Sequence, residues 1–125
     1  MPRLVTCPSS TFEPNERKIN VNWKHYLAAV AVGFFLGNAV SHLVAGVTDQ
    51  MFPSPFGDPP SIGLSSPFVN AVWGLANIAI GYVFFRISKA HASHTWLMIA
   101  FFLGFAGVTL FSSVHFEAAF GNSGL

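Results

Sequence analysis

Residues 26–47 read YLAAVAVGFFLGNAVSHLVAGV, an apolar run without a single Lys, Arg, Asp or Glu. Two runs of similar length follow at residues 67–87 and 95–114, and their one charged side chain is Arg86, near the end of the second run. At 1.5 Å per residue, roughly 20 residues of helix cross a hydrocarbon core of about 30 Å. Because lipid offers the backbone no hydrogen-bond partner, such runs are expected to be helices. The sequence therefore predicts an all-α integral membrane protein with three transmembrane helices.

The composition agrees with this prediction. The chain has 125 residues, of which 52% are hydrophobic and only 9% are charged, whereas soluble domains carry about 25% charged residues. Its length predicts a single transmembrane domain over residues 1–125. The net charge is +1 and no dense basic cluster is present, so the expected partner is the lipid bilayer and not nucleic acid. The lone Cys7 has no partner for an internal disulfide and matches no metal-binding spacing.

The positions of the positive charges predict the orientation. All six lysines and arginines fall in two places, before the first run and at the end of the second: Arg3, Arg17, Lys18, Lys24, Arg86 and Lys89. With three spans these two places are on one side, and the positive-inside rule makes that side the cytoplasm. We therefore expect the N-terminus in the cytoplasm and the C-terminus outside. The long polar leader favours an uncleaved first span over a signal peptide. A bacterial inner membrane is the expected location, and a eukaryotic plasma or endoplasmic reticulum membrane also fits.

The segments between the spans are expected to differ in character. Residues 1–24 are polar and aperiodic, which predicts a flexible cytoplasmic tail. The outer loop 48–66 is rich in proline, so we expect neither helix nor sheet there, and it is either a stiff connector or a lid. At its end, Ser66 is the expected N-cap of the second helix and Pro67 its first residue. The inner loop 88–94 is short, which predicts a tight antiparallel hairpin of the second and third helices. The final stretch, HFEAAFGNSGL, is expected to form a short interfacial helix that ends at Gly121-Asn122.

Small residues recur on the predicted helices. On the first helix they occupy every fourth position and include one G-x-x-x-G: Ala29, Gly33, Gly37, Ser41 and Ala45. The second helix has a comparable face that includes Gly74 and Gly81. In lipid, helices associate where small residues let their backbones approach closely. Something is expected to pack tightly on the first helix, either the other two helices or a second copy of the chain.

A few polar residues interrupt the spans. Placed by depth, Asn38 and Asn77 fall near the midplane, and a second group falls together in the outer quarter: His42, Asn70, Ser112 and His115. Polar groups at these depths are costly unless they are paired, and ionisable ones mark functional sites by default. The interfacial histidines His25, His91 and His94 are weaker candidates, because exposed histidines near headgroups are common.

Two interpretations of the polar cluster remain open. In one, His42 and His115, with Glu117 or Asp49, form a metal, haem or acid–base site near the outer face. No H-x-x-x-H or H-E-x-x-H spacing supports it, so a metal and a catalytic role remain hypotheses for these residues. In the other, the polar side chains hydrogen-bond across helices, Asn38 to Asn77 and His42 to Asn70 or Ser112.

The second interpretation leads to the preferred function. We expect a small polytopic protein that acts as a homo-oligomer or as a subunit of a larger membrane complex, with itself or other membrane subunits as partners. A membrane-embedded enzyme or metal- or haem-binding protein is the alternative, and an oligomeric channel or carrier for a small solute is another. Three helices are too few to enclose a transport path, so a channel would need several copies. No cofactor is assigned, and enzymatic activity is left open.

Overall fold

The computed structural model describes residues 1–6, 20–90 and 94–121. It contains three helices and two short strands: α1 (Trp23–Val47), β1 (Phe52–Pro53), β2 (Leu64–Ser65), α2 (Pro67–Ser88) and α3 (Thr95–Phe120). All three helices are long and apolar enough to cross a membrane, as the three predicted spans require. Cys7, Arg17, Lys18 and His91 lie outside the described residues.

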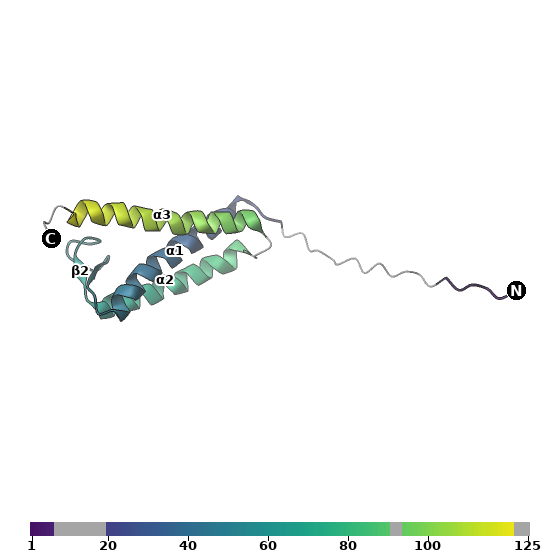
Figure 1. The fold of residues 1–125 in the computed structure, drawn as a ribbon, viewed down its shortest axis with the longest axis horizontal. Helices are drawn as coiled ribbons and strands as arrows, with labels where there is room; N and C mark the ends of the chain where they lie inside the picture. Colours follow the sequence, from purple (N-terminus) through teal and green to yellow (C-terminus); the bar gives the residue numbers. More distant parts are fainter. Residues whose placement is uncertain (7–19, 91–93, 122–125) are drawn as a thin grey trace.

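The helices are arranged around α1, which packs against both α2 and α3. The start of α1, the end of α2 and the start of α3 lie at one end of the molecule, called here the inner end after the predicted orientation (Figure 1). Toward the outer end, which carries the β-hairpin, α3 diverges from the α1–α2 pair (Figure 1). The predicted tight hairpin of α2 and α3 is therefore wrong: their connection is short, but each helix packs mainly on α1.

Glycines explain why α1 is the central helix. A Cβ atom at Gly33 would overlap the carbonyl oxygen of Phe101, and one at Gly104 would overlap that of Val30, so the backbones of α1 and α3 touch. Gly37 continues this contact, because a Cβ atom built on it would lie only 2.6 Å from Val108 Cγ1. The predicted small-residue stripe on α1 thus packs inside the chain, with all members buried except the half-buried Ser41: Ala29, Gly33, Gly37 and Ala45. Gly74 and Gly81 of α2 likewise face Leu43 and Leu36 of α1.

Local capping sets where the helices begin and end. The side chain of Asn22 accepts from the backbone N–H of Lys24 (3.1 Å), and His25 Nδ1 accepts from Asn22 N–H (2.9 Å), so α1 begins three residues before the predicted span. Ser66 caps α2 and Pro67 is its first residue, as predicted. The predicted C-terminal helix is present up to Phe120, with Gly121 as its C-cap, but it continues α3, because no glycine or proline interrupts residues 115–120.

The outer loop is folded, contrary to the sequence-based expectation that it contains no sheet. β1 and β2 pair antiparallel, with Phe52 opposite Ser65 and Pro53 opposite Leu64. The pairing tolerates Pro53 because proline is accepted at the edge of a sheet, where its missing N–H costs no ladder bond. Behind the hairpin, the hydroxyls of the buried Ser54 and Ser65 lie 2.6 Å apart.

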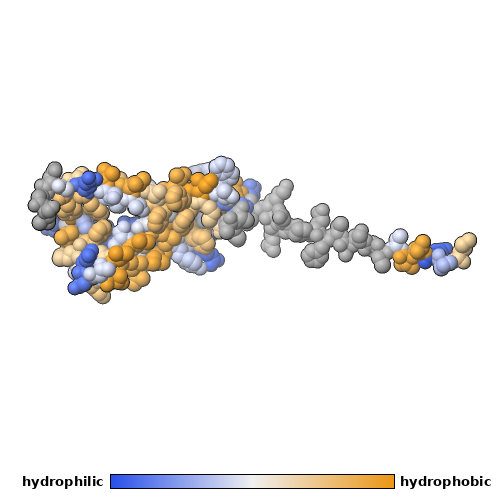
Figure 2. Space-filling model, viewed as in Figure 1, coloured by the Kyte–Doolittle hydropathy of each residue, from blue (hydrophilic) through white to orange (hydrophobic). Residues whose placement is uncertain are grey.

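The outside of the helices is apolar. Hydrophobic atoms cover the middle of the helical body and hydrophilic atoms gather toward its ends (Figure 2). Large side chains such as Phe102, Leu103 and Leu110 are more than half exposed on α3. A water-soluble monomer rarely exposes apolar surface on this scale, whereas a lipid-facing surface requires it.

Candidate functional site

A cavity of about 240 Å³ lies in the outer half of the molecule, between α1, α2, the hairpin loop and Phe116 of α3. We call it the outer cavity. Its polar lining consists of Asn38 and His42 on α1, Ser54 and Ser61 on the loop, and Trp73 and Asn77 on α2. Phe34, Phe35 and Phe116 form its aromatic walls. It therefore collects three of the predicted cluster residues in one place: Asn38, His42 and Asn77.

Asn70 holds the residues around this site in place, although it is fully buried and does not itself line the cavity. Its Nδ2 donates to three backbone carbonyl oxygens, those of Phe52 (3.1 Å), Ser65 (3.0 Å) and Ser66 (3.1 Å). A carbonyl oxygen only accepts, so the amide has one orientation and Oδ1 points to His42. Asn70 therefore ties the hairpin to α2 and presents an acceptor to α1.

The acceptor on Asn70 determines the proton position on His42. His42 Nδ1 lies 2.7 Å from Asn70 Oδ1, and because that oxygen only accepts, Nδ1 must carry the hydrogen. In the neutral imidazole, Nε2 then holds a lone pair and is an acceptor. In the part of the chain that the structure describes, His42 Nε2 makes no hydrogen bond. It is also accessible from the cavity that the imidazole ring lines. The predicted contact from His42 to Asn70 is present.

A second chain of bonds fixes Asn38 in the same way. Asn77 Nδ2 donates to the backbone carbonyl of Trp73 (2.8 Å), so Asn77 Oδ1 faces α1 and accepts from Asn38 Nδ2 (3.0 Å). This is the interhelical bond predicted from the depth of the two residues. Asn38 Oδ1 is left without a partner in the described part of the chain, and it too remains open to the cavity. The network thus leaves two acceptors on α1, four residues apart and on one helix face.

Trp73 is the residue that sequence reasoning undervalued. Its indole Nε1 is a buried donor without a hydrogen-bond partner, the only side-chain atom of that kind among the described residues. The ring of Phe56, from the outer loop, stands perpendicular to the indole at 5.3 Å between centroids. A buried unpaired donor costs about 1–3 kcal/mol. The spacing of Trp73 and Asn77 put the indole near the cluster, but only the loop conformation shows that Phe56 covers it.

The α3 candidates are not bonded to this network. The ring centroids of His42 and Phe52 are 5.3 Å apart, those of Phe52 and Phe116 are 5.2 Å apart, and those of Phe116 and His115 are 5.5 Å apart. The ring contacts therefore link the two histidines only indirectly, through two phenylalanines. The hydroxyl of Ser112 makes no hydrogen bond in the part of the chain that the structure describes, and Glu117 and Asp49 are exposed. In that same part, no three His, Cys, Asp or Glu side chains are placed to hold a metal ion. The divergence of α3 at the outer end explains this separation.

Comparison of the chain with protein-family models, curated proteins and solved structures gives no match. The chemistry of the outer cavity is therefore the guide to function. Two hydrogen-bond acceptors stand among aromatic walls under a folded loop, an arrangement typical of sites that orient a small apolar molecule by a few polar contacts.

Proposed function

We propose that this multi-pass membrane protein binds, in the outer cavity, a small lipid-soluble molecule that carries a hydroxyl or amino group. The supporting observation is the pair of acceptors, Asn38 Oδ1 and His42 Nε2, which the fixed hydrogen-bond network leaves unpaired at the cavity. A ligand with a donor group satisfies one or both of them, at about 0.5–1.5 kcal/mol for each neutral hydrogen bond. Its apolar body fits against Phe34, Phe35 and Phe116.

We infer further that the protein acts as a homo-oligomer or as a subunit of a larger membrane complex. Three helices are too few to enclose a transport path, so a cavity of this size serves best as the ligand-holding part of an assembly. The small-residue stripe of α1 does not supply the contact, because it packs against α3. Partners would therefore use the exposed apolar faces of the helices, which include the outward faces of α2 and α3. The subunit stoichiometry of the protein, extracted in mild detergent, tests this inference.

The proposed orientation places the inner end in the cytoplasm, in a bacterial inner membrane. In a Cys7→Ser background, a cysteine introduced by Ser61→Cys is expected to react with a membrane-impermeant maleimide in intact cells. One introduced by Lys89→Cys is expected to react only after the membrane is opened, since the positive charges hold that end inside. Gel-shift labelling measures both. Reaction of the Lys89→Cys variant in intact cells, with protection of Ser61→Cys, would reverse the orientation.

Ligand binding is tested with a photoreactive long-chain alcohol in vesicles that contain the protein. We expect labelling within residues 34–42 and 73–77, mapped by peptide mass spectrometry. The matched methyl ether lacks the donor hydrogen and is expected to label these peptides about fivefold less, as the loss of about 1 kcal/mol implies.

Two variants separate binding from folding. His42→Asn retains a donor near the Nδ1 position for Asn70 but removes the Nε2 acceptor, and Asn38→Leu removes the other acceptor. Each is expected to lower labelling by the alcohol about fivefold, whereas Val40→Leu, at a position half exposed on α1, is the matched control without effect. Equal labelling by alcohol and ether, or indifference to both variants with the fold intact, would refute the proposal.

A further inference from the structure

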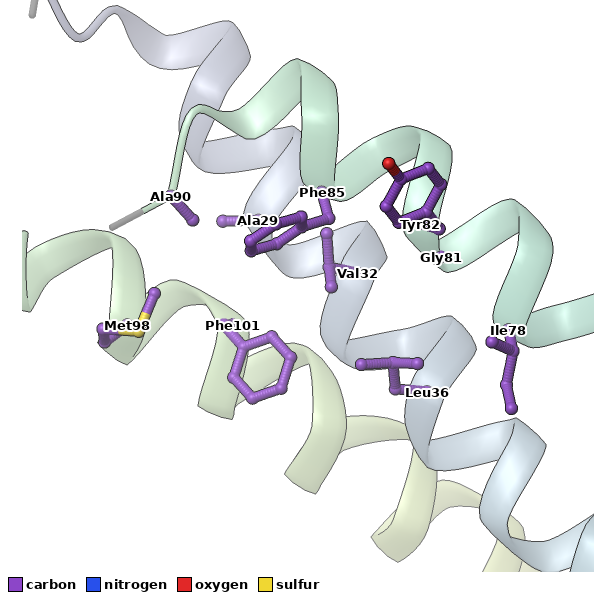
Figure 3. Close-up of a pocket in the computed structure, with 10 residues that line it drawn as sticks. All are labelled: Ala29, Val32, Leu36, Ile78, Gly81, Tyr82, Phe85, Ala90, Met98 and Phe101. Carbon is purple, nitrogen blue, oxygen red and sulfur yellow. The ribbon is translucent and has the colours of Figure 1, made fainter. Parts of the chain in front are cut away.

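A second hollow lies on a different face of α1 and belongs to the inner half of the molecule. It is an apolar groove of about 380 Å³ that α1 floors and α2 and α3 flank (Figure 3). We call it the inner groove. Val32 and Leu36 come from α1, Ile78 and Phe85 from α2, and Met98 and Phe101 from α3, and their side chains gather around one space (Figure 3). The Tyr82 hydroxyl is the one polar side-chain group among the residues drawn there (Figure 3).

The groove follows from the packing of the helices. Because α2 and α3 each pack mainly on α1, their facing sides leave a gap between them. Gly81 lines the groove from α2, and Ala29 lines it from α1. Ala29 lies six residues after the start of α1, so the inner mouth of the groove is about 9 Å along the helix. The groove therefore runs at the depth of acyl chains and ends near the headgroups.

A positive charge stands at this inner mouth. Arg86 donates from Nη1 to the hydroxyl of Tyr82 (3.1 Å), whose ring lines the groove. That bond uses one of the five N–H donors of the guanidinium and leaves the others for an anion. Lys89, at the C-cap of α2, adds a second cation at the same end. Ala90, the residue after it, lines the groove itself.

Among the described residues, no acidic side chain is a neighbour of Arg86 at the inner end. Their carboxylates are Asp49 and Asp58 in the outer loop and Glu117 near the outer end of α3. A positive inner mouth joined to an apolar groove complements one kind of molecule in a membrane, an anionic phospholipid. Basic pockets between transmembrane helices on the cytoplasmic side are suited to such headgroups.

We propose that the inner groove binds one anionic phospholipid, with an acyl chain between α2 and α3 and the phosphate at Arg86. The acyl chain fills the gap between the two helices and so completes their packing on this side of α1. The headgroup contact selects for negative charge, because a guanidinium binds phosphate oxygens through paired hydrogen bonds. This site is separate from the outer cavity and does not depend on the ligand proposed for it.

Native mass spectrometry tests this proposal on the full chain in nanodiscs. The discs contain equal amounts of phosphatidylglycerol and phosphatidylcholine with identical acyl chains. We expect one phosphatidylglycerol retained per chain in preference to phosphatidylcholine. Arg86→Gln is expected to lower that preference about fivefold, the factor equivalent to about 1 kcal/mol per basic residue. Lys24→Gln removes the same charge from the inner end of α1, away from the groove, and is expected to leave the preference unchanged.

A second variant tests the groove itself. Gly81→Leu projects a side chain into the groove, and its Cβ meets nothing closer than 3.5 Å, so the helix contact tolerates the first carbon. We expect this variant to lose the retained lipid regardless of headgroup. Val83→Leu, at an exposed position two residues further on, is the control that keeps it. The proposal would be overturned if the unmodified protein retained both lipids equally, or if Gly81→Leu did not affect lipid retention. A lipid-free dimer that forms through the inner groove would overturn it as well.

Discussion

Gly33→Ala is expected to destabilise the folded protein by about 3 kcal/mol, the upper part of the range for overpacked cores. A single methyl group has this effect because it would overlap the carbonyl oxygen of Phe101 and lie 2.7 Å from the amide nitrogen of Phe105. Both atoms belong to the backbone of α3, which can retreat only if the whole helix moves. The separation of α1 and α3 would then release the contacts of Gly37 and Gly104 as well.

Gly107→Ala is the matched control for this change. Gly107 lies on the same α3 helix, but a Cβ built on it meets nothing within 4 Å. Alanine favours a helix over glycine, so the control is expected to be neutral or to stabilise by up to about 1 kcal/mol. Unfolding in mixed micelles of increasing dodecyl sulfate content, followed by circular dichroism, measures both variants. Equal stability of Gly33→Ala and Gly107→Ala would mean that α1 and α3 do not touch through their backbones.

Asn70→Leu is expected to have a comparable effect, of about 3 kcal/mol or more, with the damage concentrated in the outer loop. The substitution removes the donor to the carbonyls of Phe52, Ser65 and Ser66 and the acceptor for His42. Each buried group left unpaired costs about 1–3 kcal/mol. The hairpin loses its attachment to α2, so the amides of residues 52–65 are expected to exchange hydrogen much faster.

Asn77→Leu is the matched control for Asn70→Leu. Asn77 is on the same helix and is equally buried, but it bonds Asn38 and its own helix instead of the loop. Its loss is expected to cost about 1 kcal/mol, the usual value for a polar contact between membrane helices. Hydrogen exchange in the loop is expected to stay unchanged. Similar rates of amide hydrogen exchange in the loop of the two variants would show that Asn70 does not anchor the loop.

The sequence predicted the parts of this fold that depend on local chemistry. Hydropathy predicts the length of the helices, and capping predicts that α2 begins at Ser66–Pro67. Depth in the membrane predicts the pairing of Asn38 with Asn77. Each of these signals can be read from single segments of the sequence. The small-residue stripe on α1 was also visible, although its partner was left open. Close packing at a glycine depends on the position of the facing backbone, and only the structure shows that α3 supplies it.

Features that depend on distant segments were missed. The fold of the outer loop was not predicted, because its proline content argues against a sheet. The hydrogen bonds that anchor the loop come from Asn70, which lies five residues past the second strand. His42 and His115 fall at similar depths, but depth predicts neither the divergence of α3 nor the contacts of His42 with Phe52 and of Phe52 with Phe116. The unpaired indole of Trp73 is likewise a consequence of where Phe56 lies.

The central position of α1 has a consequence for how the protein is made. The chain emerges from the ribosome N-terminus first, so α1 enters the membrane before either helix that packs on it. Its leucine-lined face is covered as soon as α2 follows, but the glycine face of Gly33 and Gly37 stays uncovered until α3, the third of these helices, is synthesised. Until then that strip of backbone is in contact with lipid or with an insertion factor. The closure of α3 thus completes a two-helix intermediate that is packed on one side only.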